Sequence, residues 1–164
     1  MTTILADAQK RIMVADSMAV YGANKFASSK VERHNGSLYG LAGDVYEAMT
    51  WFRSIVGKET VPYAWGSEKE HFEVLVLSPD GSLMLHHQGR TGIPIHQRFY
   101  AVGSGDQAAM AAIRAMERLG VEPDAETAVA AACDVNAHSF LPVEVFHLDV
   151  LSTARRASRK KATP

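Results

Sequence analysis

The second residue of the chain, Thr2, carries two groups that could do chemistry together. Initiator methionine is commonly removed before a small residue, and removal of Met1 would leave the threonine hydroxyl beside a free α-amine. A hydroxyl is a weak nucleophile until a base takes its proton, and an α-amine with a pKa of about 7.7–8.0 is neutral often enough to be that base. The alternative is that Thr2 is simply the second residue of a buried strand. The first interpretation predicts nucleophilic catalysis.

Three further polar residues stand next to short apolar or glycine-rich segments. Asp16 closes an apolar run, Lys30 precedes Val31, and Ser104 lies between two glycines. A lysine with an ordinary pKa of about 10.4 is mostly protonated, so it suits electrostatic support better than proton abstraction. Each residue also has a plainer interpretation: Asp16 as a turn residue, Lys30 as a solvated charge and Ser104 as a helix cap.

The histidines and the cysteine do not form a recognisable metal or cofactor site. His86 and His87 are adjacent on an expected strand, so they point to opposite faces and cannot bind one ion together. The other histidines show no ligand spacing, and no phosphate-binding glycine loop precedes a helix. Cys133 is the single cysteine, which fits a reducing compartment. We therefore expect no metal, no cofactor and a cytoplasmic protein.

The periodicity of apolar residues predicts the elements that must position these side chains. Ser78-Pro79-Asp80-Gly81 predicts the turn of a hairpin, and Asp106 and Gly120 are a candidate N-cap and end of one helix. The order of strands, one helix, strands, two helices and a strand indicates an α+β protein of face-to-face antiparallel sheets with helices outside. The expected strands are 3–8, 11–16, 37–42, 71–77, 82–86, 98–102 and 143–149, and the expected helices are 44–56, 106–119 and 124–138.

Length, composition and charge limit the class of protein. The 164 residues suit one domain, expected over 2–150, followed by a basic tail at 151–164. No stretch approaches the roughly 18 apolar residues of a membrane helix, and no secretory signal is evident. Five bases and no acid follow residue 154, so the chain's net charge of −1 leaves −6 on the rest. The composition therefore argues against a membrane protein and against a nucleic-acid-binding surface.

Five short motifs occur along the chain in this order: Thr2-Thr3-Ile4, Val14-Ala15-Asp16-Ser17, Ser29-Lys30-Val31, Gly40-Leu41-Ala42-Gly43-Asp44 and Val102-Gly103-Ser104-Gly105. Together they resemble the proteasome β-type subunits, and most of all the bacterial HslV (ClpQ) peptidases of the N-terminal nucleophile (Ntn) hydrolase superfamily. The resemblance runs from Thr2 to about Asp149. It implies a four-layer αββα sandwich of two antiparallel sheets flanked by helices, the Ntn-hydrolase fold.

The resemblance implies a role for each matching residue. Thr2 matches the nucleophile, whose hydroxyl attacks a peptide carbonyl and whose amine is the base. Lys30 matches the lysine whose ammonium favours the threonine alkoxide, and Asp16 matches the aspartate that holds that lysine.

Other residues match positions that assist the nucleophile or bind the substrate. Gly43 matches the glycine whose backbone N–H forms the oxyanion hole, and Ser104 matches the serine that assists proton transfer at the amine. Asp134 matches the aspartate of the last helix that contacts this network. The positions implied to bind substrate are Ala19, Val20 and Leu41.

The resemblance also implies an assembly and partners. The family forms hexameric or heptameric rings, single or stacked as double rings, that enclose their active sites, cleave peptides and work with an AAA+ ATPase unfoldase. In this chain residues 57–70 are too short, and too interrupted by Gly57, Pro62 and Gly66, to supply the family's second long helix. That helix faces the unfoldase, so the family's ATPase partner does not carry over to this chain on the strength of the resemblance alone.

Three functions remain open on the sequence. The first is a threonine-type endopeptidase of a self-compartmentalising ring, active once Met1 is removed. The second is a catalytically weak ring-forming homologue that acts as a structural or binding assembly, and a retained Met1 would favour it because the amine would be blocked. The third is a free-standing amidase of the same nucleophile class, which a stable monomer with an open site would favour.

Overall fold

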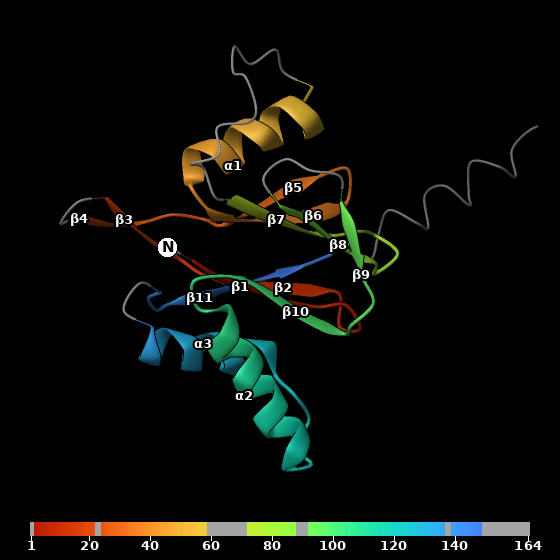
Figure 1. Cartoon of the computed structure of the whole chain (residues 1–164), viewed down its shortest axis with the longest axis vertical. Coiled ribbons are helices and arrows are strands. Elements are labelled where there is room, and N and C mark those ends of the chain that lie inside the picture. The colour runs from red at the N-terminus through yellow and green to blue at the C-terminus, as the bar shows by residue number, and fades with distance from the viewer. Residues whose placement is uncertain (1, 22–23, 59–71, 88–91, 137–138, 149–164) are drawn as a thin grey trace, which may run out of the picture.

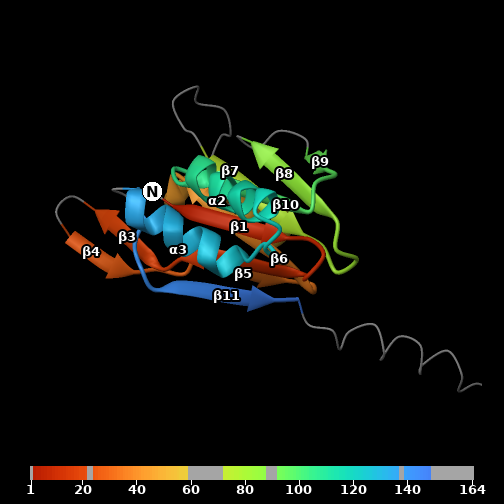
Figure 2. The same ribbon diagram turned by 90° about the horizontal axis from the view of Figure 1, so that it is seen from below.

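Two antiparallel sheets lie face to face, and helices cover both outer faces. In the computed structural model, which describes residues 2–21, 24–58, 72–87, 92–136 and 139–148, α1 (Val45–Trp51) covers one sheet, while α2 (Asp106–Arg118) and α3 (Ala125–Val135) cover the other (Figure 1; Figure 2). The expected αββα sandwich is therefore confirmed. The strands are β1 (Thr3–Asp7), β2 (Ile12–Asp16), β3 (Met18–Tyr21), β4 (Asn24–Ala27), β5 (Val31–His34), β6 (Ser37–Gly43), β7 (Phe72–Leu77), β8 (Leu83–His87), β9 (Ile93–Ile95), β10 (Phe99–Gly103) and β11 (Val143–His147).

The first sheet has the strand order β10-β1-β2-β11 and buries the start of the chain at its centre. Both β1 and β2 are buried at every position. Successive side chains of a strand point to opposite faces, so Ile4 and Ala6 face the other sheet while Leu5 faces the helices. A strand covered on both faces is apolar throughout, which explains the continuous apolar sequence at the beginning of the chain.

The second sheet has the order β5-β6-β7-β8-β9, with every neighbouring pair antiparallel. Its inner face contributes Leu38, Leu75 and Leu85 to the core between the sheets. Its outer face, with Leu41 and Val74, packs on α1. The predicted hairpin at residues 71–86 is confirmed as β7 and β8. A separate two-stranded sheet joins β3 to β4.

The helices differ from the expected ranges at their ends. The first helix passes from α1 into a π-helical turn, η1 (Phe52–Val56), in which the N–H of Gly57 donates to the carbonyl of Phe52. The expectation that Asp106 is an N-cap was wrong, because Gly105 holds that position and Asp106 begins α2. The last helix ends at Val135 rather than at residue 138, since Asn136 has an extended backbone.

Four short strands were not expected from the sequence: β3, β4, β5 and β9. Alternation was a weak signal in them, because β5 reads VERH and β9 carries Pro94, which is tolerated at the edge of a sheet. The expected absence of a second long helix falls at residues 57–70, of which 59–70 lie outside the described residues. The expected basic tail, 151–164, lies wholly outside them. Within the described ranges, no helix is long and apolar enough to cross a membrane.

Gly40 lies against side chains of the opposite sheet, and it yields a test of the sandwich. A Cβ at this position would lie 2.8 Å from Met13 Sδ and 2.9 Å from Ile4 Cγ2, both in the opposite sheet. We expect Gly40→Ala to lower the free energy of unfolding by about 1–3 kcal/mol, since an added methyl overpacks the core. Ser37→Ala on the same strand is the control, expected to change stability by less than about 0.5 kcal/mol. Equal urea midpoints for Gly40→Ala and the wild type would contradict this packing.

Candidate active site

Thr2 lies between the two sheets, with its side chain 1 % exposed. The start of β1 runs into the space between the sheet layers (Figure 1). Thr2 directly precedes β1, and its hydroxyl contacts Lys30 at the start of the second sheet. The hydroxyl of Thr3 instead contacts Ser139, which follows α3. The fold thus buries the residue that the sequence singled out as a nucleophile.

Lys30 is the side chain that meets the Thr2 hydroxyl. It directly precedes β5 and is 3 % exposed, and its Nζ donates to Thr2 Oγ1 over 3.0 Å. Burial lowers the pKa of Lys30, and the charge of Asp16 opposes that change. The contact brings a cation within hydrogen-bond distance of the oxygen that would carry negative charge in an attack.

Asp16 supplies the counter-charge at the end of β2. Its Oδ2 lies 3.9 Å from Lys30 Nζ, and its Oδ1 accepts a hydrogen bond of 2.8 Å from the backbone N–H of Thr3. Burial raises the pKa of Asp16, whereas the hydrogen bond from Thr3 and the charge of Lys30 lower it. Removing either member of a buried pair leaves the other charge uncompensated, so the two residues depend on each other.

The segment Gly103-Ser104-Gly105 closes against the backbone of Thr2. Gly103 has a φ of +95°, and a Cβ there would collide with the Thr2 carbonyl oxygen. Ser104 Oγ donates to that oxygen over 3.4 Å and itself accepts from Asn136 Nδ2 over 3.3 Å. A side chain on Gly105 would overlap Thr3 Oγ1. Both glycines are therefore required for this loop to reach the start of the chain.

A cavity of about 190 Å³ opens beside Thr2. Among the described residues, its lining consists of Thr2, Gly43, Phe72, Glu73, His87, Gly103 and Ser104. Gly43 ends β6 with a φ of +91°, a conformation that favours glycine. The cavity therefore brings together Thr2, the glycine that the resemblance assigns to the oxyanion hole, and Ser104.

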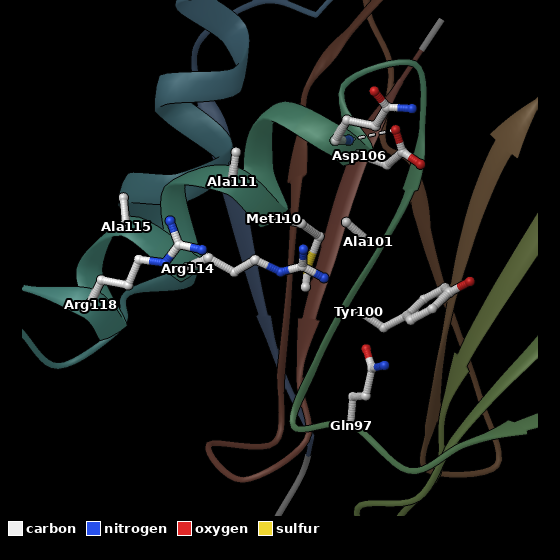
Figure 3. Close-up of a pocket in the computed structure, with 10 residues that line it drawn as sticks. Gln97, Tyr100, Ala101, Asp106, Met110, Ala111, Arg114, Ala115 and Arg118 are labelled. Carbon is white, nitrogen blue, oxygen red and sulfur yellow. Dashed lines mark hydrogen bonds between the residues drawn. The ribbon is translucent and has the colours of Figure 1, made fainter.

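A larger cavity of about 560 Å³ lies along α2, away from this group. Arg114 and Arg118 extend from α2 and Gln97 and Tyr100 come from the β10 side (Figure 3). None of its lining residues contacts Thr2, Lys30 or Asp16 through a hydrogen bond or ion pair in the described part of the chain. We therefore place the candidate active site at the smaller cavity.

Three of the remaining sequence candidates, Asp134, Ala19 and Leu41, do not line the cavity. Asp134 is exposed at the end of α3, and among the described residues no hydrogen bond joins it to Thr2 or Ser104. Ala19 is buried on β3, and Leu41 packs beneath α1. Val20 also belongs to β3, but its side chain is not among those that the structure describes. The roles implied for these residues stay predictions.

The structure adds residues that the sequence analysis did not select. Ser139 Oγ lies 2.6 Å from Thr3 Oγ1 and ties the segment after α3 to the start of β1. Asn136 contacts Ser104, and Glu73 and His87 line the cavity. One sequence signal was available for Glu73, since a carboxylate inside the apolar run FEVLVL is unusual. The others had no local signal.

Comparison with solved structures places this arrangement in a known fold. A Thiobacillus denitrificans protein named BPH, in complex with epoxomicin, is similar with a TM-score of 0.68 and 21% identity, over 90% of this chain and 99% of that one. HslV from Trypanosoma brucei gives a TM-score of 0.65 and 21% identity, over 89% and 99%. A second structure of the Thiobacillus BPH gives 0.60 and 20%, over 91% and 98%.

No protein-family model and no curated protein matches the sequence. The likeness to solved structures nevertheless extends over nearly the whole length of each. It confirms the resemblance to HslV at the level of the fold, and the chain has the Ntn-hydrolase fold.

Proposed function

We propose that the chain is a threonine-type peptidase whose nucleophile is Thr2, exposed by removal of Met1. The observation that carries the proposal is the 3.0 Å hydrogen bond from Lys30 Nζ to Thr2 Oγ1, made by two side chains that are both at least 97 % buried. The conditions for activating a hydroxyl are a nearby base and a nearby positive charge. The α-amine of a trimmed Thr2 supplies the first, and Lys30 supplies the second.

In the proposed first step, Thr2 Oγ1 attacks the carbonyl carbon of a peptide bond. The α-amine accepts the hydroxyl proton, while the Lys30 ammonium stabilises the charge that develops on the oxygen. Because a neighbouring cation disfavours a second positive charge, discouraging protonation of the α-amine is a second role proposed for Lys30. The backbone N–H of Gly43 is the proposed donor to the carbonyl oxygen of the substrate.

In the following steps the C–N bond of the substrate breaks, and the protonated α-amine of Thr2 returns its proton to the leaving amine. The acyl group remains on Thr2 Oγ1 as an ester. Water then attacks the ester with the α-amine again as base, which releases the acid and restores the threonine. Ser104 is the proposed assistant in these proton transfers, because its hydroxyl already contacts the Thr2 backbone.

The nucleophile can be tested by substitution together with intact mass. We expect the purified chain to lack Met1, to hydrolyse peptides and to gain the mass of one epoxomicin, the compound bound by the Thiobacillus protein. Thr2→Ala should lose hydrolysis and labelling while the protein stays folded, with a lower unfolding midpoint because the buried Lys30 ammonium loses its hydrogen-bond acceptor. Thr50→Ala, at a buried threonine of α1, is the control and should retain both. Full hydrolysis by Thr2→Ala would exclude Thr2, and a retained Met1 would favour a structural assembly.

Lys30 provides a second test, because its charge rather than its volume is proposed to act. We expect Lys30→Ala to lower the turnover number about 10²–10³-fold, as for loss of one oriented electrostatic donor. Lys30→Arg should restore little, since a planar guanidinium places its charge and donors differently. Burial lowers the pKa of Lys30, so the wild-type rate should fall at a lower pH than it would if the lysine had its ordinary pKa. Lys10→Ala, in the turn after β1, is the control. Wild-type turnover in Lys30→Ala would remove this lysine from the mechanism.

A peptidase of this kind must keep its site away from folded proteins, so we also propose a closed ring or stacked double ring of identical chains. Apolar side chains exposed on the helical layers suit such contacts, among them Ile55 after α1 and Val135 at the end of α3. An ATPase unfoldase is the partner that such a ring would need for folded substrates.

The ring can be tested by sedimentation. The wild type should sediment as a multiple of 17.8 kDa at micromolar concentration. Ile55→Glu combined with Val135→Glu should shift the distribution toward the monomer, because a buried unpaired carboxylate is costly. Glu126→Gln, on the exposed face of α3, is the control for a surface change. A monomer as the only species of the wild type would contradict the ring and favour a free-standing amidase.

A further inference from the structure

The cavity beside Thr2 contains a carboxylate that the proposed mechanism does not use. Glu73 lies on β7, opposite Ala42 of β6 and His87 of β8. Leu75 and Leu77, which share its face of the strand, point into the core between the sheets. Glu73 therefore faces inward, at the end of the core where the sheets open at Thr2.

Among the described residues, Glu73 has one hydrogen bond and no ion pair. Its Oε2 accepts one long hydrogen bond of 3.4 Å from the backbone N–H of Gly103. In the described part of the chain no lysine or arginine forms an ion pair with it, while the nearby Lys30 is paired with Asp16. A half-buried carboxylate with a single backbone donor retains acceptor capacity for a cation.

The size of the cavity suits one side chain. An apolar cavity of about 150 Å³ is known to hold a benzene molecule, and this one measures about 190 Å³. Phe72 supplies an apolar wall for the methylene stem of a long side chain, and Glu73 supplies the charge for its end. Since the same cavity contains Thr2 and Gly43, the residue that enters it must be next to the bond under attack.

We propose that Glu73 is a specificity-determining residue, which makes this site prefer peptides with lysine or arginine next to the scissile bond. The inference rests on the proposed peptidase function. It adds a substrate class to that function and involves none of the groups proposed to transfer protons.

The test uses two series of quenched fluorescent peptides. In each series a single residue is varied among Lys, Gln and Glu, either directly before or directly after the scissile bond. For the wild type we expect kcat/KM to be about tenfold higher with Lys than with Gln at one of these positions, the size expected for a charge-assisted hydrogen bond. Added salt should reduce that ratio. Glu73→Gln should bring the ratio close to one, and Glu73→Lys should make Glu the preferred residue.

The matched control is Glu117→Gln, which removes the same charge from the exposed face of α2 and should leave the Lys preference unchanged. A wild-type preference that survives Glu73→Gln would overturn the proposal. So would an equal loss of rate with every peptide, because Glu73 would then be acting on the Thr2 amine instead of the substrate.

A binding measurement separates this inference from the peptidase proposal. Fluorescence anisotropy with the Thr2→Ala variant should show about tenfold tighter binding of the Lys peptide than of the Gln peptide, and Thr2→Ala combined with Glu73→Gln should bind both alike. If the wild type cleaves nothing but this binding difference is present, the peptidase proposal fails and the cation site stands. If the wild type cleaves all peptides equally and binding shows no difference, the peptidase proposal stands and the specificity inference fails.

Discussion

The contact between Lys30 and Thr2 constrains much of the surrounding structure. An ammonium group that is removed from water must be compensated by an opposite charge and by hydrogen bonds, or it loses its proton. Asp16 provides the charge at 3.9 Å, and Thr2 accepts the hydrogen bond at 3.0 Å. Asp16 ends β2 of the first sheet and Thr2 directly precedes β1 of the same sheet, whereas Lys30 directly precedes β5 of the second sheet. The polar contact therefore bridges the two layers, in addition to the apolar packing between them and the hydrogen bonds from Gly103 to Glu73 and from Arg33 to His147.

The position of Thr2 depends on the burial of the strand that follows it. β1 pairs with β10 on one side and with β2 on the other, and its two faces are covered by the second sheet and by α2 and α3. Such a strand has little freedom to shift, so its first residues are held in place. The hydrogen bonds of Thr3 with Asp16 and Ser139 add to this restraint at the first residues that the structure describes.

The fold and the site carry different kinds of information. The fold is shared with HslV and BPH at 20–21% identity, and a fold alone does not define an activity. The proposal of a peptidase rests instead on Thr2, Lys30 and Asp16. The proposal of a preference for basic residues rests on Glu73, which enters the cavity because the register of β7 places it on the inner face, beyond the apolar core. The proposed chemistry would then draw on residues of both sheets and the proposed selectivity on the second sheet, and they meet at one cavity.

The sequence by itself determined the period-two or continuously apolar runs that mark most of the strands, the turn at residues 78–81 and the order of the elements, because periodicity and turn chemistry report burial within a few residues. Thr2 and Asp16 stood out by their chemistry and position, and the resemblance of five ordered motifs to a known family added Lys30 and Ser104 as candidates. Only the tertiary structure decided which candidates meet. Sheet pairing brings Glu73 beside His87, the stacking of the sheets brings Lys30 to Thr2, and the end of α3 brings Asn136 to Ser104. Such contacts depend on strand register and layer packing between segments far apart in the chain, and no short stretch of sequence encodes either.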